Sequence, residues 1–545
     1  MTIKQDIELP AFGKTTVPTG LFIDNEWVAS SDSKSFSTIN PATGDHFLDF
    51  AHATEEDVDT AVKAARKAFK TTWGMNVAST ERAALLFKLA DLMEQNAAKI
   101  GALESLNSGK GVRIAREADV ADSIACLRYY AGLADKLHGQ TINHFGKEKF
   151  VYTLHQPIGV CGQIIPWNYP LLMWAWKVAP AVAAGCCVII KPSELTPLTA
   201  LYLCDLVVEA GFPAGVINVL PGLGASTGDA ISRHMDIDKV AFTGSVPTGR
   251  RIAIAAAESN LKKVTLELGG KSPMLVFDSA DVEEAAAWVA MGIWFNSGQD
   301  CCASSRVYVQ EGIYEKFLTA LKAKAEACAI GDPADEKTSF GPLISANQRD
   351  KVLAYIESGR EAGARVVTGG QKWPQSGGGY WIEPTILADV KADMKAVKEE
   401  IFGPVIVAAS FKTEEEALEL ANNTEYGLAA AVFTNDARQA TRVTAALDAG
   451  TVWCNQYALL HAGVPFGGFK QSGIGRELGT YGLDAYTQVS DFGISRRWIT
   501  CLLMISVMGG AYGRVGQSGP SKPKPDHGMA DMKKQRMLFA VYECN

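Results

Sequence analysis

The feature that most constrains the fold is a regular alternation of short β-branched runs with helical stretches between residues 158 and 269. The helical stretches end at glycines such as Gly185 and Gly211, and each run between them has the length of one buried strand. Strands that alternate with helices form crossover units and therefore a parallel sheet, in which ligands bind beyond the carboxyl ends of the strands. The strands predicted in this way cover residues 160–165, 188–190, 216–219, 240–242 and 264–268.

A second region of the same kind runs from residue 301 to about residue 489. Its alternating pattern predicts a second α/β lobe. The strands expected there cover residues 306–309, 405–411, 429–434 and 451–455.

The segments that precede and link these regions have other patterns. Residues 20–49 place turn residues between short apolar runs, which predicts a hairpin. Thr54 with Asp57 resembles a capping arrangement at the start of the first helix, and further helices are expected through residue 140. In residues 149–155 apolar side chains alternate with the rest, which predicts a strand with one exposed face.

Length and charge limit the class of protein. A chain of 545 residues is expected to form roughly three or four domain-sized units. Its 52 basic and 60 acidic side chains give a net charge of −8, which disfavours binding to nucleic acid or to anionic membranes. The apolar stretch 498–508 is shorter than the roughly 20 residues that a membrane-spanning helix needs.

The cysteines and histidines indicate the compartment and argue against a metal enzyme. The eleven cysteines form no C-x-x-C pair, and several lie in apolar runs, which predicts reduced thiols in a cytoplasmic protein. Residues 1–20 have neither a basic start with an apolar core nor an Arg-rich amphipathic pattern, so no signal or transit peptide is expected. The eight histidines form no metal-binding motif, and no catalytic metal is expected.

Cys301 is the candidate nucleophile. Polar and small residues around it interrupt an apolar helix and precede a strand, and a thiol on such a turn is accessible for reaction. An unpaired cysteine in a large cytoplasmic protein is more often structural, and that interpretation is kept for Cys302 and for residues 186–187.

Residues 295–303 read Phe-Asn-Ser-Gly-Gln-Asp-Cys-Cys-Ala, which resembles the cysteine signature of the aldehyde dehydrogenases. One departure is Trp294, where the family commonly has a smaller residue, and we expect an effect on the substrate pocket. A second motif, Leu-Glu-Leu-Gly-Gly-Lys-Ser-Pro at 266–273, and a third, Ile-Pro-Trp-Asn-Tyr-Pro at 165–170, also resemble this family. The resemblance covers about residues 20–489.

The resemblance implies a role for one residue of each motif. Cys301 would attack the aldehyde and carry a thioester. Glu267 would activate the water that hydrolyses the thioester, a role worth roughly 10²–10⁴ in rate. The side-chain amide of Asn168, together with the backbone N–H of Cys301, would stabilise the oxyanion, and such a donor is worth on the order of 10²–10³.

The expected cofactor is NAD. Glu194, which follows the strand at 188–190, can hydrogen-bond the adenine ribose and repel a 2′-phosphate, which favours NAD over NADP. The glycines of residues 222–228 form a weak phosphate-binding pattern, and Ser245 at a helix start could hold the pyrophosphate. The cofactor-binding residues expected from the resemblance are Ile165, Trp167, Lys191, Glu194, Gly224, Gly228, Phe242, Gly244, Ser245, Leu268, Gly269, Glu400 and Phe402.

The substrate is expected to enter an apolar tunnel, although each tunnel candidate taken alone is more often a core residue. Sequence does not choose among aldehydes, because the width of a tunnel depends on side-chain packing. The expected lining residues are Tyr169, Met173, Trp176, Phe295 and Phe466.

The resemblance also implies an aldehyde dehydrogenase-like α/β fold that assembles into a homodimer or homotetramer. A Rossmann-like NAD-binding domain would comprise residues 1–138 and 158–269, a catalytic α/β domain residues 270–475, and a small β oligomerisation arm residues 139–157 and 476–495. Residues 496–545 form an atypical tail that is expected to be poorly ordered.

Two alternatives to hydrolytic aldehyde oxidation stay open. A CoA-acylating dehydrogenase would pass the acyl group of the thioester to a thiol, and Glu267 argues against it. A cofactor-binding structural protein would be inactive because its C-terminus departs from the pattern of the family after residue 489.

Overall fold

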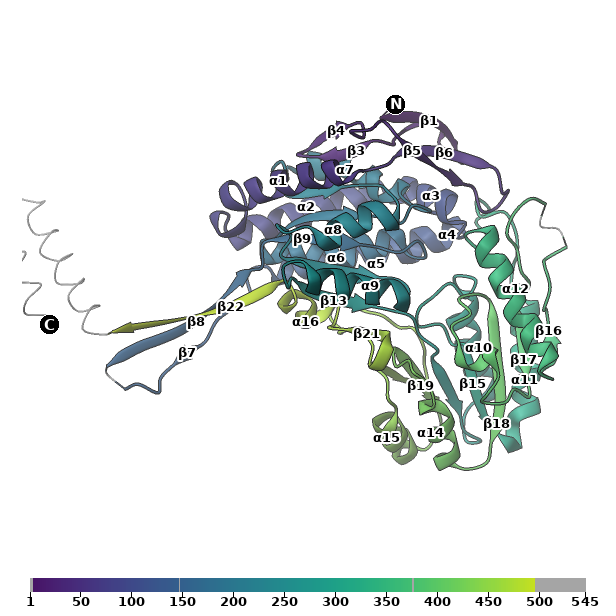
Figure 1. The fold of residues 1–545 in the computed structure, drawn as a ribbon. Helices are drawn as coiled ribbons and strands as arrows, with labels where there is room; N and C mark the ends of the chain where they lie inside the picture. Colours follow the sequence, from purple (N-terminus) through teal and green to yellow (C-terminus); the bar gives the residue numbers. More distant parts are fainter. Residues whose placement is uncertain (1–2, 147, 375–376, 496–545) are drawn as a thin grey trace, which may run out of the picture. The chain divides into compact units, whose positions relative to one another are not determined.

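A computed structural model of the chain describes residues 3–146, 148–374 and 377–495 (Figure 1). The chain forms two compact units, and the larger comprises Met1–Lys136 and Pro157–Thr487. This unit contains two main sheets, one of eight strands and one of seven.

The eight-stranded sheet has a parallel centre in the order β13-β12-β9-β10-β11. These five strands agree with the five predicted runs to within one residue at each end. Antiparallel strands complete the sheet, with β21 beside β13 and the hairpin β3-β4 beside β11. The strands are β3 (Leu21–Ile23), β4 (Glu26–Val28), β9 (Val160–Ile164), β10 (Cys187–Lys191), β11 (Ile217–Val219), β12 (Lys239–Thr243), β13 (Lys263–Glu267) and β21 (Gly473–Ile474).

Helices cover both faces of this sheet. The connections after β9 and after β11 run in opposite directions along the sheet, so right-handed crossovers place α6 and α7 on one face and α8 and α9 on the other. The N-terminal helices α2, α3 and α5 pack against α6 and α7, whereas α1 contacts α8. The helices are α1 (Glu55–Thr71), η1 (Gly74–Asn76), α2 (Ser79–Gln95), α3 (Ala97–Ser108), α4 (Val112–Ile114), η2 (Ala115–Val120), α5 (Ala121–Leu133), α6 (Pro170–Ala184), α7 (Leu198–Ala210), η3 (Gly224–Gly228), α8 (Asp229–Arg233) and α9 (Val246–Glu258).

Two local predictions for the N-terminal region are confirmed. Residues 20–49 contain antiparallel pairs, β3-β4 and β5-β6, and β1-β2 forms another pair before them. The hydroxyl of Thr54 accepts the Asp57 N–H while the Asp57 carboxylate accepts the Thr54 N–H, so a capping box starts α1. These strands are β1 (Lys4–Leu9), β2 (Gly13–Pro18), β5 (Ser35–Ile39) and β6 (His46–Ala51).

The point where the strand order reverses lies between β9 and β12. In an open parallel sheet the crevice at such a switch point is the usual ligand site. The segments that leave this point are residues 165–168 after β9 and residues 244–245 after β12. The fold therefore brings the Asn168 turn and the Ser245 turn to one edge of the sheet.

The seven-stranded sheet has the order β16-β17-β18-β15-β14-β19-β20. The four predicted strands of this lobe are present, and β14, β16 and β17 were not predicted. Within the described ranges no helix combines the length and the apolar character needed to cross a bilayer. The elements are β14 (Pro273–Val276), α10 (Val282–Trp294), β15 (Arg306–Gln310), η4 (Glu311–Ile313), α11 (Tyr314–Glu326), α12 (Ala346–Glu361), β16 (Arg365–Thr368), β17 (Thr385–Ala388), α13 (Lys395–Lys398), β18 (Val405–Phe411), α14 (Glu414–Asn422), β19 (Ala429–Phe433), α15 (Ala437–Ala446), β20 (Thr451–Cys454), η5 (Lys470–Ser472) and α16 (Gly479–Asp484).

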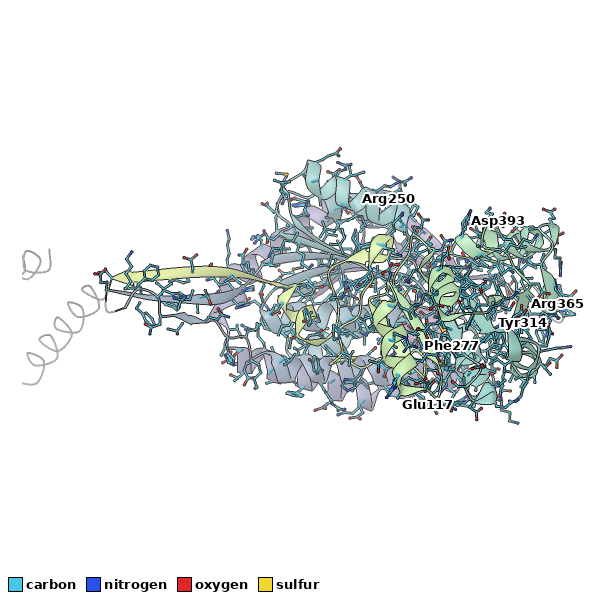
Figure 2. All side chains as sticks on the ribbon, turned by 90° about the horizontal axis from the view of Figure 1, so that it is seen from below. Glu117, Arg250, Phe277, Tyr314, Arg365 and Asp393 are labelled. Atoms are coloured by element: carbon cyan, nitrogen blue, oxygen red, sulfur yellow. The ribbon has the colours of Figure 1, made fainter. Side chains whose placement is uncertain are left out.

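Apolar packing holds this second lobe together, and Figure 2 labels Phe277, Tyr314 and Arg365 within it. The rings of Phe277 and Phe411 lie 5.2 Å apart in a core that α14 and α15 cover. At the outer edge, Asp389 accepts hydrogen bonds from the Tyr314 hydroxyl at 3.1 Å and from Arg365 Nε at 2.7 Å. The lobe is thus a second α/β layer with its own core.

The smaller unit is a three-stranded sheet in the order β22-β8-β7. Its strands are β7 (Thr141–Ile142), β8 (Lys149–Pro157) and β22 (Thr487–Ser495), and the rings of Tyr152 and Phe492 stack at 5.2 Å. These strands come from the two segments predicted as an arm. The predicted tail, residues 496–545, lies outside the described residues.

Candidate active site

A cavity of about 180 Å³ lies at the carboxyl ends of β9, β12 and β13. Three predicted catalytic residues, Asn168, Glu267 and Cys301, line it together. The other residues that line it are Pro166, Trp167, Thr243, Gly244, Ser245, Leu268, Gly269, Gln348, Lys351, Glu400 and Phe402. Segments that are far apart in the sequence therefore share one partly open cavity.

Two glycines allow the loop of Cys301 to approach its neighbours closely. Gly298 has a φ of +72°, and a Cβ atom there would lie 1.9 Å from the carbonyl oxygen of Gly403. A Cβ atom at Gly270 would lie 2.3 Å from the carbonyl oxygen of Cys301. Because neither position accommodates a side chain, both motif glycines keep this loop packed against its surroundings.

The Cys301 thiol is half-buried and lies near several negative charges. The hydrogen bond with the Cys302 thiol lowers the pKa of Cys301, but burial raises it, as do three nearby carboxylates, and the net shift is upward. The carboxylates belong to Asp300, Glu267 and Glu400. These surroundings alone keep the thiol protonated at neutral pH, so formation of the thiolate requires a base or an added positive charge.

Glu267 ends β13 and is 5% exposed. Both of its carboxylate oxygens lack a hydrogen-bond partner among the residues that the structure describes. Burial raises the pKa of Glu267 well above its usual range, Glu477 raises it further, and Lys177 and Arg476 act in the opposite direction. A buried carboxylate with free oxygens and a raised pKa can serve as a general base near neutral pH.

A buried ion pair near Glu267 was missed by the sequence reasoning. Lys177 of α6 donates from Nζ to Thr243 Oγ1 at 2.7 Å and to the Glu477 carboxylate. The signal that could have located it is a single lysine in the otherwise apolar residues 170–184, since a buried cation must be paired. This pair sets the charge around Glu267.

Asn168 lies in the turn between β9 and α6 and is 6% exposed. Its Nδ2 donates to the carbonyl oxygen of Gln299 at 3.0 Å, which uses one of the two N–H groups of the amide. Asn296 donates to the same carbonyl at 3.1 Å and to the carbonyl oxygen of Asn168 at 3.0 Å. Asn296 and Gln299, which carried no separate prediction, therefore hold the Asn168 turn against the Cys301 loop.

One wall of the cavity is formed around Glu400. Its Oε1 accepts the N–H of Gly270 at 2.9 Å, and a Cβ atom at Gly269 would lie 2.5 Å from its Oε2. The rings of Trp167 and Phe402 meet edge to face at 5.2 Å. All of these except Gly270 belong to the predicted cofactor set, and the close approach of Glu400 leaves no room for a side chain at Gly269.

Gln348 and Lys351 of α12 also line the cavity and were not predicted. Gln348 donates from Nε2 to the carbonyl oxygen of Phe402 at 2.7 Å. Neither residue lies in a recognisable motif, so the sequence alone did not indicate that they line the cavity, and the packing of α12 against it does.

Four predicted cofactor residues lie around the end of β10, outside the lining of this cavity. Lys191 Nζ lies 3.3 Å from Glu194 Oε2, and burial lowers the pKa of Lys191. A Cβ atom at Gly228 would lie 3.8 Å from Lys191 Cδ, whereas Gly224 has open space around it. This strand end therefore offers a paired lysine and acid next to glycine backbone.

Three further predicted positions lie at or beneath the cavity. Ile165 and Phe242 are buried, and the Ile165 N–H donates to the carbonyl oxygen of Lys191 at 3.1 Å. Ser245 precedes α9, and its Oγ donates to Thr248 Oγ1 at 3.0 Å.

Both the sequence and the fold resemble known enzymes. Residues 27–492 match the aldehyde dehydrogenase family. The chain belongs to that family. An aldehyde dehydrogenase of Emericella nidulans is 55% identical over 483 residues, which cover 89% of this chain and 96% of the relative. The family match ends at residue 492, three residues beyond residue 489, where the resemblance was predicted to end.

Solved aldehyde dehydrogenase structures share the fold. The NAD+ complex of the Bacillus cereus aldehyde dehydrogenase is 48% identical, with a TM-score of 0.85 over 88% of this chain and 96% of that chain. An indole-3-acetaldehyde dehydrogenase of P. syringae in complex with NAD+ and IAA is 40% identical, with a TM-score of 0.86 over 88% of this chain and 97% of that chain. The predicted aldehyde dehydrogenase-like α/β fold is thereby confirmed.

The predicted substrate-pocket residues of this aldehyde dehydrogenase do not line the 180 Å³ cavity. The rings of Trp176 and Phe466 meet at 5.5 Å, and the Tyr169 hydroxyl donates to Asp300 at 2.9 Å. Met173 is buried and Phe295 is half-buried.

Trp294, the departure from the family signature, is buried, and its indole N–H donates to the carbonyl oxygen of Pro404 at 3.4 Å. It does not line the 180 Å³ cavity. The expected effect of Trp294 on the substrate pocket stays a prediction.

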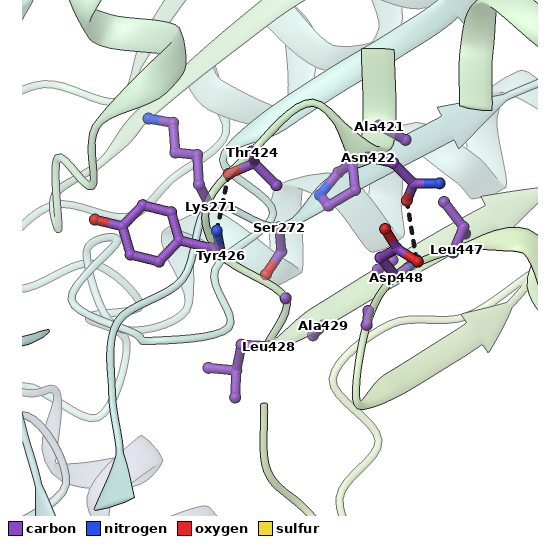
Figure 3. Close-up of a pocket in the computed structure, with 14 residues that line it drawn as sticks. Lys271, Ser272, Ala421, Asn422, Thr424, Tyr426, Leu428, Ala429, Leu447 and Asp448 are labelled. Atoms are coloured by element: carbon purple, nitrogen blue, oxygen red, sulfur yellow. Dashed lines mark hydrogen bonds between the residues drawn. The ribbon is translucent and has the colours of Figure 1, made fainter. Parts of the chain in front are cut away.

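Lys271 of the second family motif lies at a different, much smaller cavity of about 10 Å³ (Figure 3). Burial lowers the pKa of Lys271 to about 7, and the positive charge of Arg306 acts in the same direction. Within the described ranges Lys271 Nζ has no hydrogen-bond partner. A space of this size holds about one water molecule, so Lys271 does not contact a substrate there.

Proposed function

We propose that this aldehyde dehydrogenase oxidises an aldehyde to a carboxylic acid and reduces NAD, through a thioester on Cys301 that water activated by Glu267 hydrolyses. The observation that carries the proposal is the shared cavity of Asn168, Glu267 and Cys301. A thiol, a free carboxylate and an amide donor in one cavity are the groups that acyl chemistry at a carbonyl carbon requires.

NAD is the proposed cofactor, as in the solved relatives whose complexes contain NAD+. The residues fit a dinucleotide, because the cavity lies at a topological switch point and Gly244 and Gly269 line it where side chains would collide with Phe242 and Glu400. When bound, NAD accepts the hydride that the aldehyde carbon loses.

Each proposed cofactor contact follows from the type of group. Ser245 precedes α9, a helix of 13 residues whose N-terminus suits a pyrophosphate. Glu194 and Lys191 would bind the adenine ribose, and Glu400 would bind the nicotinamide ribose through its carboxylate. The remaining proposed contacts are Ile165, Trp167, Gly224, Gly228, Phe242, Gly244, Leu268, Gly269 and Phe402.

The chain's own residues perform the chemistry at the carbonyl carbon. The Cys301 thiol first releases its proton to solvent, which the positive charge that NAD+ would add to the cavity favours. The thiolate attacks the carbon, and the oxygen of the resulting thiohemiacetal accepts hydrogen bonds from the Asn168 amide and the Cys301 N–H. Loss of the hydride leaves a thioester on Cys301. Glu267 then takes a proton from water, the water oxygen attacks the thioester carbon, and the carboxylic acid leaves as the thiolate re-forms.

Two variants test these roles. Cys301→Ala abolishes NADH formation with acetaldehyde while NAD binding persists, and Cys454→Ala, a half-buried cysteine in β20, keeps full turnover as the matched control. Glu267→Gln accumulates an acyl adduct on Cys301 that intact-protein mass spectrometry detects. Turnover in Cys301→Ala, or an adduct on another residue, would contradict the assignment.

Product analysis separates hydrolysis from acyl transfer. The product with and without CoA is expected to be the free acid in both cases, because Glu267 is present to activate water. Formation of an acyl-CoA would replace the hydrolytic proposal with the CoA-acylating one. No NADH formation with acetaldehyde, benzaldehyde, betaine aldehyde or indole acetaldehyde would favour an inactive NAD-binding protein.

The same proposal extends to substrate, domains and location. Tyr169, Met173, Trp176, Phe295 and Phe466 would form the aldehyde tunnel. Residues 1–138 and 158–269 would bind NAD, and residues 270–475 would carry out catalysis. All nine described cysteines are free thiols, which supports a cytoplasmic enzyme, and cell fractionation tests this location.

Assembly is also proposed, with residues 139–157 and 476–495 as the arm of a homodimer or homotetramer; residues 157 and 476–487 of this arm belong to the larger unit, and the rest to the smaller one. Within that unit Phe145, Leu154 and Val489 are exposed by 48%, 37% and 60%. Apolar side chains on a sheet of this kind favour burial against a partner. Light scattering of the full chain tests this, since a monomer contradicts it, and intact mass shows whether residues 496–545 are made.

A further inference from the structure

Next to the Cys301 thiol lies a second thiol with a carboxylate, and the proposed reaction uses neither. One ligand atom from each of Asp300, Cys301 and Cys302 lies within 4.8 Å of the other two. Cys302 Sγ donates to Asp300 Oδ1 at 3.2 Å, and the two thiols share a hydrogen bond. Three potential metal-ligand atoms thus lie close to one another, and hydrogen bonds of the thiol groups now link them.

We propose that Asp300, Cys301 and Cys302 form an inhibitory binding site for Zn²⁺. Two thiolates and one carboxylate are ligands that zinc accepts, whereas Mg²⁺ and Ca²⁺ prefer sets of oxygen atoms alone. With metal–sulfur and metal–oxygen bonds of about 2.3 and 2.0–2.2 Å, the ligand atoms of a tetrahedral site lie roughly 3.5–3.8 Å apart. Small shifts from the present separations are therefore sufficient, and Cys302 Sγ and Asp300 Oδ1 would move slightly apart from 3.2 Å. The fourth position of the tetrahedron stays open to water.

The charges around the site favour a cation. The carboxylates of Asp300, Glu267 and Glu400 all place negative potential on the Cys301 thiol. This potential opposes a bare thiolate but stabilises a thiolate that is bound to a divalent cation. Binding replaces the two thiol protons by one Zn²⁺, and both protons leave to solvent.

The ion can reach the site from the cavity, and hydrogen bonds fix the position of the Asp300 carboxylate. Cys301 lines the 180 Å³ cavity, so a hydrated ion reaches its sulfur from there. Asp300 is fixed on the other side, because its Oδ2 accepts the Tyr169 hydroxyl at 2.9 Å and its Oδ1 accepts the Cys302 N–H at 3.0 Å. Such outer contacts orient a ligand before the metal arrives.

Inhibition follows from the proposed function, on which this part of the inference rests. A Cys301 sulfur that is bound to zinc shares its negative charge with the ion and is a weaker nucleophile, and the ion with its water occupies the space through which an aldehyde approaches. Enzyme with one bound ion is therefore expected to be inactive, and a chelator restores its activity.

Direct binding and activity are measured separately on the full chain. The background carries Cys501→Ser and Cys544→Ser, because these two cysteines lie outside the described residues. Equilibrium dialysis with ZnCl₂ is expected to show one tightly bound ion, up to two protons released per ion, and loss of NADH formation that EDTA reverses. Co²⁺ in place of Zn²⁺ is expected to show thiolate charge-transfer absorption.

Cys302→Ala isolates the second thiol. It is expected to turn over aldehyde but to weaken Zn²⁺ binding by more than the roughly 10–100-fold that loss of an outer contact costs. Asp300→Asn weakens binding as well, and Cys454→Ala leaves it unchanged. Thermal melting of each variant verifies that it is folded.

The outcomes distinguish the two proposals. Absence of a tightly bound ion, or equal affinity in folded Cys302→Ala, overturns the zinc site and leaves the aldehyde chemistry untouched. Zinc that binds through Cys302 without inhibiting NADH formation overturns the inhibitory site, and Cys301→Ala then decides separately whether Cys301 is the nucleophile. One bound ion that needs Cys302 and blocks turnover supports both.

Discussion

Replacement of Asn168 by alanine is a quantitative test of how the cavity stabilises an oxyanion. In a buried site, loss of one such donor costs about 2.7–4 kcal/mol of transition-state stabilisation, or roughly 10²–10³ in kcat. The change leaves no orphaned acceptor, because the Gln299 carbonyl also accepts from Asn296 at 3.1 Å. The lost contact with Gln299 is therefore expected to reduce the free energy of unfolding by only about 0.5–1.5 kcal/mol.

The assay measures NADH absorbance with acetaldehyde, together with NAD affinity and thermal melting. The matched control is Asn260→Ala, which loses hydrogen bonds from Nδ2 to the carbonyl oxygens of Met235 and Ile237 at 2.7 and 2.9 Å but does not line the cavity. Its kcat is expected to equal that of the parent enzyme. A loss of less than about tenfold in Asn168→Ala, with NAD affinity intact, would refute the oxyanion role.

Three further predictions concern charge. Glu267 acts as a base only when it is deprotonated, so kcat rises with pH through the raised pKa of Glu267. Glu477→Gln removes a charge that raises this pKa and is expected to move the acid limb of the kcat profile to lower pH. An acid limb that does not move contradicts this argument. Lys177→Met leaves Glu477 buried without its paired cation and costs about 3–5 kcal/mol in denaturant unfolding, whereas Lys63→Met at an exposed pair is expected to leave the free energy of unfolding nearly unchanged. Glu194→Ser lowers the preference for NAD over NADP, read as a ratio of kcat/KM values, and an unchanged ratio rules Glu194 out as the discriminating acid.

The parallel centre of the first sheet could be predicted because four of its five strands, all except β13, are buried along their whole length and alternate with helical stretches that end at glycines. The strands that were missed in the second lobe lack this pattern. β14 reads Pro-Met-Leu-Val, β16 begins with Arg365 and ends with Thr368, and β17 reads Thr-Ile-Leu-Ala, so none of them is a continuous run of apolar β-branched residues. Their assignment depends on neighbouring strands that the local sequence does not show.

The candidate site divides in the same way. Asn168, Glu267 and Cys301 could be located because each lies in a motif, although their roles stay predictions. The contact between Lys177 and Glu477 joins residues 300 positions apart, and the place of Gln348 depends on how α12 packs. Such long-range contacts follow from tertiary packing, and a single sequence contains no periodicity that reports them.

Strand β21 has a consequence for how the nucleotide is exchanged. After β20 the chain returns to the first sheet, where Gly473 pairs with Glu267. The preceding Ser472 binds the segment after β13 twice, because its carbonyl oxygen accepts the Leu268 N–H at 2.9 Å and its hydroxyl donates to the Gly269 carbonyl at 2.7 Å. The two lobes are thus tethered twice, once before β14 and once at β21. A large hinge motion between the two lobes would break the pairing of β13 with β21 next to Glu267. Release of the reduced dinucleotide is therefore expected to require only local movement of surface loops, while Glu267 keeps its position.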